Sequence, residues 1–248
     1  MSRRVVVTGA SRGIGRVIAQ RFAQLGDEVV AVARDRRDLD RLRDETPGAI
    51  VAAPCDLVDP DAVVALMRGL DRVDVLVNNA GVSDSAPLER TSLDSWQRQM
   101  AVNATAAFLC TREVIAGMRE RGRGRIVTVA STSARAGVAY AAAYAASKHA
   151  ALGLMRSAAA ELAGTRVTAN AVCPAFVDSQ MTHDSAQRIA QHTGRSLQES
   201  LQSLATLSPL GRLVDPGEVA EAVVWLASPG TDAINGQTLI LDGGGLQP

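Results

Sequence analysis

The sequence predicts an α/β fold in which a doubly wound parallel sheet of about seven strands carries helices on both faces. Strand-like and helix-like segments alternate from residue 4 to residue 241, the pattern of parallel strands joined by helical crossovers. The strand-like runs are almost continuously apolar, as expected when both faces of a sheet are covered. No linker or internal repeat divides the chain, so we expect a single domain over residues 1–248.

The predicted strands are short runs rich in valine, alanine and isoleucine, at residues 4–8, 28–33, 50–55, 74–78, 125–130, 166–172 and 238–241. The first helix is indicated by apolar residues at helical spacing, from Ile14 through Ile18 to Phe22, and it is expected to end at Gly26. Further helices are expected around 39–42 and 63–67, over 93–118 and 142–162, and from 215 through 225. Residues 176–209 are polar and contain no obvious strand, which is typical of an irregular substrate lid.

Charge and composition argue against several classes of protein. The 26 basic and 26 acidic residues are interspersed and give zero net charge, so we expect neither a nucleic-acid partner nor an acidic-membrane surface. No segment has the length and apolar character of a membrane span, and the first residues do not resemble a signal peptide. The three cysteines are far apart, which predicts buried free thiols in the cytoplasm, without a disulfide or a metal site.

The distribution of lysine and tyrosine is more informative. Of the 26 basic residues, one is a lysine, Lys148, and the chain has just two tyrosines, Tyr140 and Tyr144. Arginine cannot replace a compact ammonium whose pKa depends on its surroundings. Lys148 follows Tyr144 by four residues, so on a helix the two share one face. We therefore expect them to act as a pair.

A glycine-rich turn joins the first strand to the first helix, with the sequence Thr8-Gly9-Ala10-Ser11-Arg12-Gly13-Ile14-Gly15. Glycines let the backbone approach a pyrophosphate, and the start of a helix offers free N–H groups and the positive end of its dipole. The G-x-x-x-G-x-G spacing differs from the usual dinucleotide fingerprint, and a simple tight turn is the alternative. The strand–turn–helix context favours nucleotide binding.

Five motifs in this order resemble the short-chain dehydrogenase/reductase family, and the resemblance runs from about residue 4 to residue 245. They are Thr8 through Gly15, Asn78-Asn79-Ala80-Gly81 with Asn103, Ser131, Tyr144-Ala145-Ala146-Ser147-Lys148, and Asn170-Ala171-Val172-Cys173-Pro174. The resemblance implies a Rossmann-type fold and an NAD(P)-dependent oxidoreductase that acts on CH–OH groups.

The resemblance also implies catalytic roles. Tyr144 would be the general acid in carbonyl reduction and the general base in oxidation, and Lys148 would lower its pKa and bind the nicotinamide ribose. Ser131, at the end of the fifth strand, would donate to the substrate oxygen. Ser133 is the alternative, but the family's thirteen-residue gap to the tyrosine favours Ser131. Asn103 would hold a water that links Lys148 to solvent.

The competing tyrosine, Tyr140, lies about two helical turns before Lys148. We expect it to line the substrate pocket rather than to transfer the proton.

The cofactor is predicted to be NADP(H), with NAD(H) as the other possibility. An acidic residue after the second strand would bind the 2′-hydroxyl of NAD, but that place holds Ala33 followed by Arg34, and Arg12 lies in the glycine turn. Two guanidinium groups suit a 2′-phosphate, although Asp35 is one position further on. The residues expected to bind the cofactor are Gly9, Ser11, Arg12, Gly13, Ile14, Gly15, Arg34, Asp56, Leu57, Asn79, Ala80, Gly81, Tyr144, Lys148, Pro174, Val177 and Ser179.

The chain departs from the family after the sixth strand. The family usually has Pro-Gly and then a threonine, whereas this chain has Pro174-Ala175 and Ser179. Alanine adopts a positive φ less readily than glycine, so the local backbone is an open question. His183 and His192 lack a partner nucleophile or metal-ligand set in the sequence, and we expect them at the surface or at the substrate rim.

The function expected from these features is NADPH-dependent reduction of a small carbonyl substrate, most simply a 3-oxoacyl thioester or a related β-keto compound. A secondary alcohol, sugar or cyclic ketone is the alternative substrate. A nucleotide-binding regulator without activity is a remote alternative, because the tyrosine, the lysine and the serine are all present. Similar proteins are tetramers, so a homotetramer is expected, formed through residues 93–118, residues 142–162 and the last strand.

Overall fold

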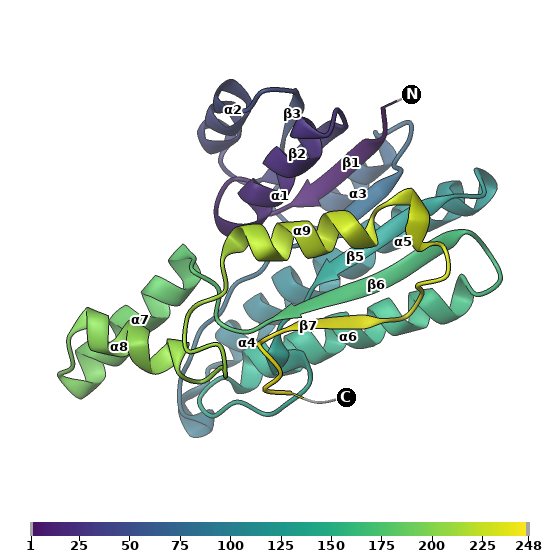
Figure 1. Cartoon of the computed structure of the whole chain (residues 1–248). Coiled ribbons are helices and arrows are strands. Elements are labelled where there is room, and N and C mark those ends of the chain that lie inside the picture. Colours follow the sequence, from purple (N-terminus) through teal and green to yellow (C-terminus); the bar gives the residue numbers. More distant parts are fainter. Residues whose placement is uncertain (1, 247–248) are drawn as a thin grey trace.

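Seven parallel strands form one sheet in the computed structural model, which describes residues 2–246. The strands are β1 (Arg4–Thr8), β2 (Glu28–Ala33), β3 (Ala49–Pro54), β4 (Val75–Asn78), β5 (Gly124–Val129), β6 (Val167–Pro174) and β7 (Thr238–Leu241). Their order is β3-β2-β1-β4-β5-β6-β7, so the direction of winding reverses between β1 and β4 (Figure 1). In such sheets ligands bind beyond the carboxyl ends of the strands at this reversal.

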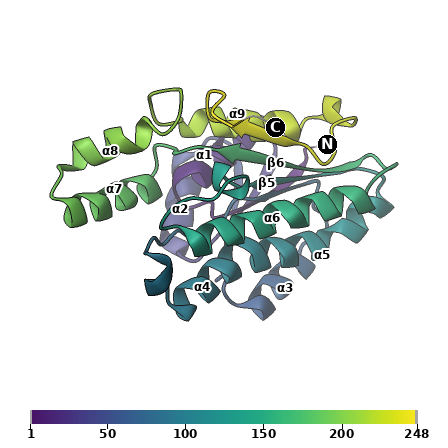
Figure 2. The same ribbon diagram turned by 90° about the horizontal axis from the view of Figure 1, so that it is seen from below.

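Helices cover both faces of the sheet, which confirms the predicted doubly wound fold (Figure 2). One face is covered by α1 (Gly13–Gln24), α2 (Arg36–Glu45) and α9 (Pro216–Leu226). The other is covered by α3 (Pro60–Arg68), α5 (Ala106–Glu120) and α6 (Ala142–Glu161). Within residues 2–246, no helix combines the length and the apolar character that crossing a bilayer requires.

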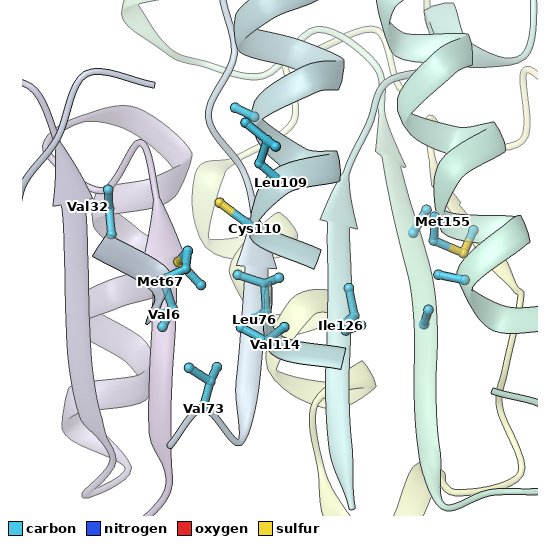
Figure 3. Packing of buried hydrophobic residues seen from close by; sticks show 14 of the residues in the cluster. Val6, Val32, Met67, Val73, Leu76, Leu109, Cys110, Val114, Ile126 and Met155 are labelled. Atoms are coloured by element: carbon cyan, nitrogen blue, oxygen red, sulfur yellow. The ribbon is translucent and has the colours of Figure 1, made fainter. Parts of the chain in front are cut away.

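Alternate side chains of the central strands supply the two halves of the core. Val6 of β1 lies beside Leu76 of β4 in the parallel register, and both point into the layer beneath α3, α5 and α6, near Met67 (Figure 3). Val5 points to the opposite face, where Phe22 of α1 is fully buried. Burial on both faces explains why these strands are continuously apolar.

The long helix predicted over residues 93–118 is present, but it is not a regular α-helix throughout. The structure has α4 (Leu93–Met100), a π-helical turn η2 (Ala101–Thr105) and then α5. Asn103 lies in that turn, and its side chain bonds the backbone of Val82. π-Helical turns inside helices are frequent at functional sites, and this one aims an asparagine amide at the loop that follows β4.

Residues 176–209 are also more ordered than the irregular segment expected from the sequence. They form α7 (Gln180–Thr193) and α8 (Leu197–Ala205), which extend from one side of the sheet in Figure 1. Gly194 at φ 72° ends α7, and a reciprocal capping box of Ser196 and Glu199 begins α8. A backbone bridge between Val177 and Val214 closes the base of this excursion. The Ser-x-x-Glu pattern was the sequence signal for the second helix.

Candidate active site

The predicted site residues come together beyond the carboxyl ends of β1, β4, β5 and β6. The glycine turn follows β1, Gly81 follows β4, Ser131 follows β5, and Tyr144 and Lys148 lie on α6. A Cβ atom placed on Gly81 would lie 3.4 Å from the Lys148 ammonium nitrogen and 3.5 Å from the Asn103 amide oxygen. Lys148 and Asn103 thus both lie close to Gly81, although the three residues are far apart in the sequence.

The glycine turn is shaped by close backbone packing. Gly9 has φ 68°, a conformation that favours glycine. A Cβ on Gly15 would lie 2.3 Å from the Gly9 carbonyl oxygen and 2.3 Å from the Asn79 amide nitrogen. The absence of side chains at these two positions is therefore needed for the turn to fold against the end of β4.

Two helices that meet at this turn begin without a side-chain cap. No side chain caps the N-terminus of α1 after Arg12 or that of α7 after Ser179. The same is true of α5 and α6, whereas α2, α3, α4, α8 and α9 each have a side-chain cap. The uncapped ends of α1 and α7 are adjacent, because a Cβ on Gly13 would lie 3.8 Å from the Ser179 Cβ. Uncapped N–H groups and two helix dipoles fit the pyrophosphate of a dinucleotide.

The charges near the end of β2 fit a 2′-phosphate. Arg12 and Arg34 are exposed, and neither has an ion-pair partner among the described residues. The acidic rival, Asp35, instead caps α2: its carboxylate accepts from the backbone N–H groups of Arg37 at 2.8 Å and Asp38 at 3.4 Å. The structure therefore gives Asp35 a role that leaves both guanidinium groups available to an anion.

Some of the other predicted cofactor residues are exposed, whereas others are buried or bond the glycine turn. Asp56 is exposed and Leu57 is buried beside it after β3. The Asn79 amide, also expected to bind the cofactor, donates to the Thr8 carbonyl at 2.8 Å. The Thr8 hydroxyl accepts from the backbone N–H groups of Asn79 and Ala80, both at 3.0 Å. Thr8 and Asn79 thus tie the glycine turn to the loop after β4.

Lys148 is a buried ammonium with one protein acceptor. Its side chain is 4% exposed, and it donates to the Val129 carbonyl at 3.0 Å, the one hydrogen bond found for it within residues 2–246. Burial lowers the pKa of Lys148 from 10.5 to about 8, so the group is mostly charged at pH 7. Two of its N–H groups are left for acceptors such as ribose hydroxyls.

Tyr144 lies beside Lys148 and Ser131, but the balance of forces on its phenol differs from the expectation. Burial raises the pKa of Tyr144, and a hydrogen bond with the Ser131 side chain opposes this rise. The Lys148 nitrogen lies 5.8 Å from the centre of the Tyr144 ring and donates elsewhere. The hydrogen bond with the serine is thus one neighbouring interaction that favours the phenolate.

Asn103 and Ser147 fix the catalytic helix in place. The Asn103 amide donates to the Val82 carbonyl at 2.9 Å and to the Ser147 hydroxyl at 2.8 Å, and its oxygen accepts from the Val82 N–H at 2.8 Å. Ser147 in turn donates to the Tyr144 carbonyl at 2.8 Å. The sequence analysis assigned no role to Ser147. A small polar residue on the buried face of an alanine-rich helix was the signal that could have found it.

The departure from Pro-Gly after β6 causes no backbone strain. Ala175 has no positive φ, and its N–H donates to the Leu241 carbonyl at 3.0 Å. Pro174 and Val177 are buried beside the site. His183 pairs with Asp178 at 2.8 Å on the half-exposed start of α7, so it belongs to the rim of the excursion.

The other predicted surface histidine, His192, also lies on α7, where its ring nitrogen is 2.8 Å from the Arg188 carbonyl oxygen. In the part of the chain that the structure describes, no three potential metal ligands cluster. The chemistry available at the site is thus that of a phenol, a hydroxyl and an ammonium beside a phosphate-binding turn.

Comparison with known proteins agrees with this geometry. Residues 9–245 match the family described as enoyl-(acyl carrier protein) reductase. The 3-oxoacyl-(acyl-carrier-protein) reductase FabG of Vibrio cholerae is 35% identical, over 96% of this chain and 95% of its own length. A crystal structure of a variant of actinorhodin polyketide ketoreductase with NADPH superposes with a TM-score of 0.93 at 36% identity and covers 98% of this chain and 97% of that one.

A more distant solved structure, levodione reductase, has the same fold. It gives a TM-score of 0.91 at 26% identity, over 98% of this chain and 96% of its own. The family match spans nearly all of the chain, and the Vibrio relative is covered over almost its entire length. The chain therefore belongs to the short-chain dehydrogenase/reductase family.

Proposed function

We propose that the protein is an NADPH-dependent carbonyl reductase that acts on a 3-oxoacyl thioester or a related β-keto compound. The observation that carries this proposal is the buried Lys148 ammonium, which lies 5.8 Å from the centre of the Tyr144 ring. A hydrogen bond with Ser131 also acts on the pKa of the Tyr144 phenol. The names of the relatives support the substrate class, since they include a 3-oxoacyl reductase and a polyketide ketoreductase.

NADPH, when bound, supplies the hydride. The protein's own part is to hold the carbonyl oxygen and to give it a proton. Ser131, 8% exposed and held by a hydrogen bond from the Ser133 N–H at 3.1 Å, would donate to that oxygen. Because burial raises the pKa of Tyr144, the phenol keeps its proton at neutral pH and can donate it to the developing alkoxide.

The Lys148 ammonium would then act on the product of that transfer. A phenolate left on Tyr144 is stabilised by a positive charge held at 5.8 Å from its ring. The remaining N–H groups of Lys148 would hold the ribose, and the uncapped starts of α1 and α7 would hold the pyrophosphate. Arg12 and Arg34 would pair with the 2′-phosphate, which accounts for the preference for NADPH over NADH.

The proposal is tested by NADPH oxidation with two substrates, acetoacetyl-CoA and a cyclic ketone. Turnover of acetoacetyl-CoA with the higher kcat/KM supports the β-keto assignment, whereas a preference for the cyclic ketone supports the alternative class, to which levodione reductase points by its name. Replacing Tyr144 by phenylalanine removes the proton donor and should lower kcat by roughly 100-fold or more. Near-wild-type turnover of that variant would contradict the catalytic assignment.

We also propose a homotetramer in the cytoplasm, with residues 176–209 as the substrate lid. Large apolar side chains are exposed on the first of the two helices expected to pack between subunits: Trp96 of α4 is 40% exposed and Phe108 of α5 is 43% exposed. The strand β7 is at the edge of the sheet. The three cysteines are free and buried, as expected in a reducing compartment. Light scattering should give a mass of four chains.

A further inference from the structure

One residue near the site has an unusual backbone conformation. Tyr140 has φ 65° and is the one non-glycine residue with a positive φ among those described. A bulky L-residue is a genuine outlier there. Such conformations persist where the surroundings enforce them, and they gather at functional sites.

The surroundings that enforce it are two loops at the mouth of the site. The Tyr140 carbonyl accepts from the Ala86 N–H at 2.8 Å, which joins the loop after β5 to the loop after β4. The next residue, Ala141, donates to the Val138 carbonyl at 3.3 Å, and α6 begins directly afterwards. The strained residue therefore immediately precedes the helix that carries Tyr144.

The ring of Tyr140 does not contribute to the core. The residue is 67% exposed, and on the same two loops Val138 is 40% exposed and Leu88 is 73% exposed. An asparagine would tolerate this φ at less cost, so neither packing nor backbone geometry calls for an aromatic residue. An exposed aromatic side chain kept at a strained position, four residues before the proton donor, is suited to bind a ligand.

We propose that Tyr140 determines substrate specificity by stacking on a ring of the substrate, so that the enzyme favours ring-bearing β-ketones over short acyclic ones. The inference rests on the proposed function, because it concerns the substrate of that same site. Aromatic rings attract one another in offset or edge-to-face contact beyond simple burial, and a short aliphatic acyl group offers no such partner.

Two variants and two matched substrates test this inference. Tyr140→Asn removes the ring but accepts the positive φ, and Tyr140→Phe keeps the ring. Ethyl benzoylacetate and ethyl acetoacetate are β-keto esters that differ by a phenyl in place of a methyl group. We expect Tyr140→Asn to raise KM for the phenyl substrate roughly 3- to 10-fold, the size of an aromatic contact. KM for ethyl acetoacetate should change less than about twofold, and Tyr140→Phe should behave as wild type with both.

The outcomes separate this inference from the proposed function. Equal KM changes for both esters in Tyr140→Asn, or no change for either, overturn the specificity role alone, as does a Tyr140→Phe variant that loses the preference. Wild-type protein that oxidises NADPH with neither ester overturns the proposed function and this inference together. The dissociation constant of NADPH should be the same in all three proteins, since Tyr140 is not part of the cofactor site.

Discussion

Replacing Lys148 by methionine should make the folded protein more stable at pH 7 while it abolishes efficient turnover. The ammonium is 4% exposed, and burial lowers its pKa from 10.5 to about 8. Each pKa unit corresponds to about 1.4 kcal/mol, so keeping this group charged in the folded state costs about 3 kcal/mol. Methionine has a similar length and carries no charge.

The gain is partly offset by one lost interaction. The Val129 carbonyl, which accepts from Lys148 at 3.0 Å, loses its ammonium donor, at a cost of about 1 kcal/mol. The net increase in the free energy of unfolding is then about 2 kcal/mol. For a chain of this size that raises Tm by roughly 4–8 °C.

The pH dependence of the free energy of unfolding independently gives the sign of the stability change in Lys148→Met. Below pH 8 the lysine is charged in both the folded and the unfolded protein, so the burial cost is present in full. Between pH 8 and 10.5 the unfolded state binds more protons than the folded state, and wild-type stability rises with pH. The difference between Lys148→Met and wild type should therefore shrink over this range.

Thermal unfolding followed by circular dichroism at pH 7 and pH 10 measures both quantities without cofactor. A methionine variant that melts below wild type at pH 7, or a difference that does not depend on pH, would refute the claim that this ammonium is retained for function at the expense of stability.

Two further substitutions test the cofactor site. Gly15→Ala places a methyl group 2.3 Å from the Gly9 carbonyl oxygen and should weaken NADPH binding at least tenfold, measured by calorimetry. Gly153→Ala, where a Cβ meets nothing within 4 Å, is the matched control, and equal affinities of the two variants would contradict the packing argument. Arg34→Asp should lower the ratio of kcat/KM for NADPH to that for NADH by about tenfold or more, because a carboxylate repels the 2′-phosphate; an unchanged ratio would exclude the arginine from phosphate binding.

The sequence was sufficient to predict the fold, because the fold depends on local patterns. The same patterns selected the residues proposed for the site. Apolar runs such as 5–7 and 75–77 are typical of strands in a sheet that is covered on both faces, and the seven predicted strands agree with the seven observed. The Tyr144 and Lys148 spacing of four residues places both on one face of any helix. A single lysine among 26 basic residues drew attention to Lys148, which the structure buries beside Tyr144.

What the sequence missed depends on contacts between distant segments. The π-helical turn at Asn103 interrupts a run with good helical spacing, and its amide is satisfied by Val82, which lies 21 residues away in the chain. Periodicity reports which face of a helix is buried, but it carries no information on a hydrogen bond made across a loop. The helices of residues 176–209 were missed because their polar composition concealed them.

Two decisions belong to the tertiary structure alone. The sequence left open whether Asp35 would bind the ribose of NAD. In the structure its carboxylate caps α2, so Arg12 and Arg34 have no acidic partner among the described residues. The strain at Tyr140 comes from a hydrogen bond between loops that follow two different strands. The spacing of residues in the sequence was enough to predict the helices and strands and to propose Tyr144 and Lys148 as a pair. The charge and the hydrogen-bond partner of each side chain were decided by burial and by contacts between distant segments, because these depend on what surrounds the side chain after folding.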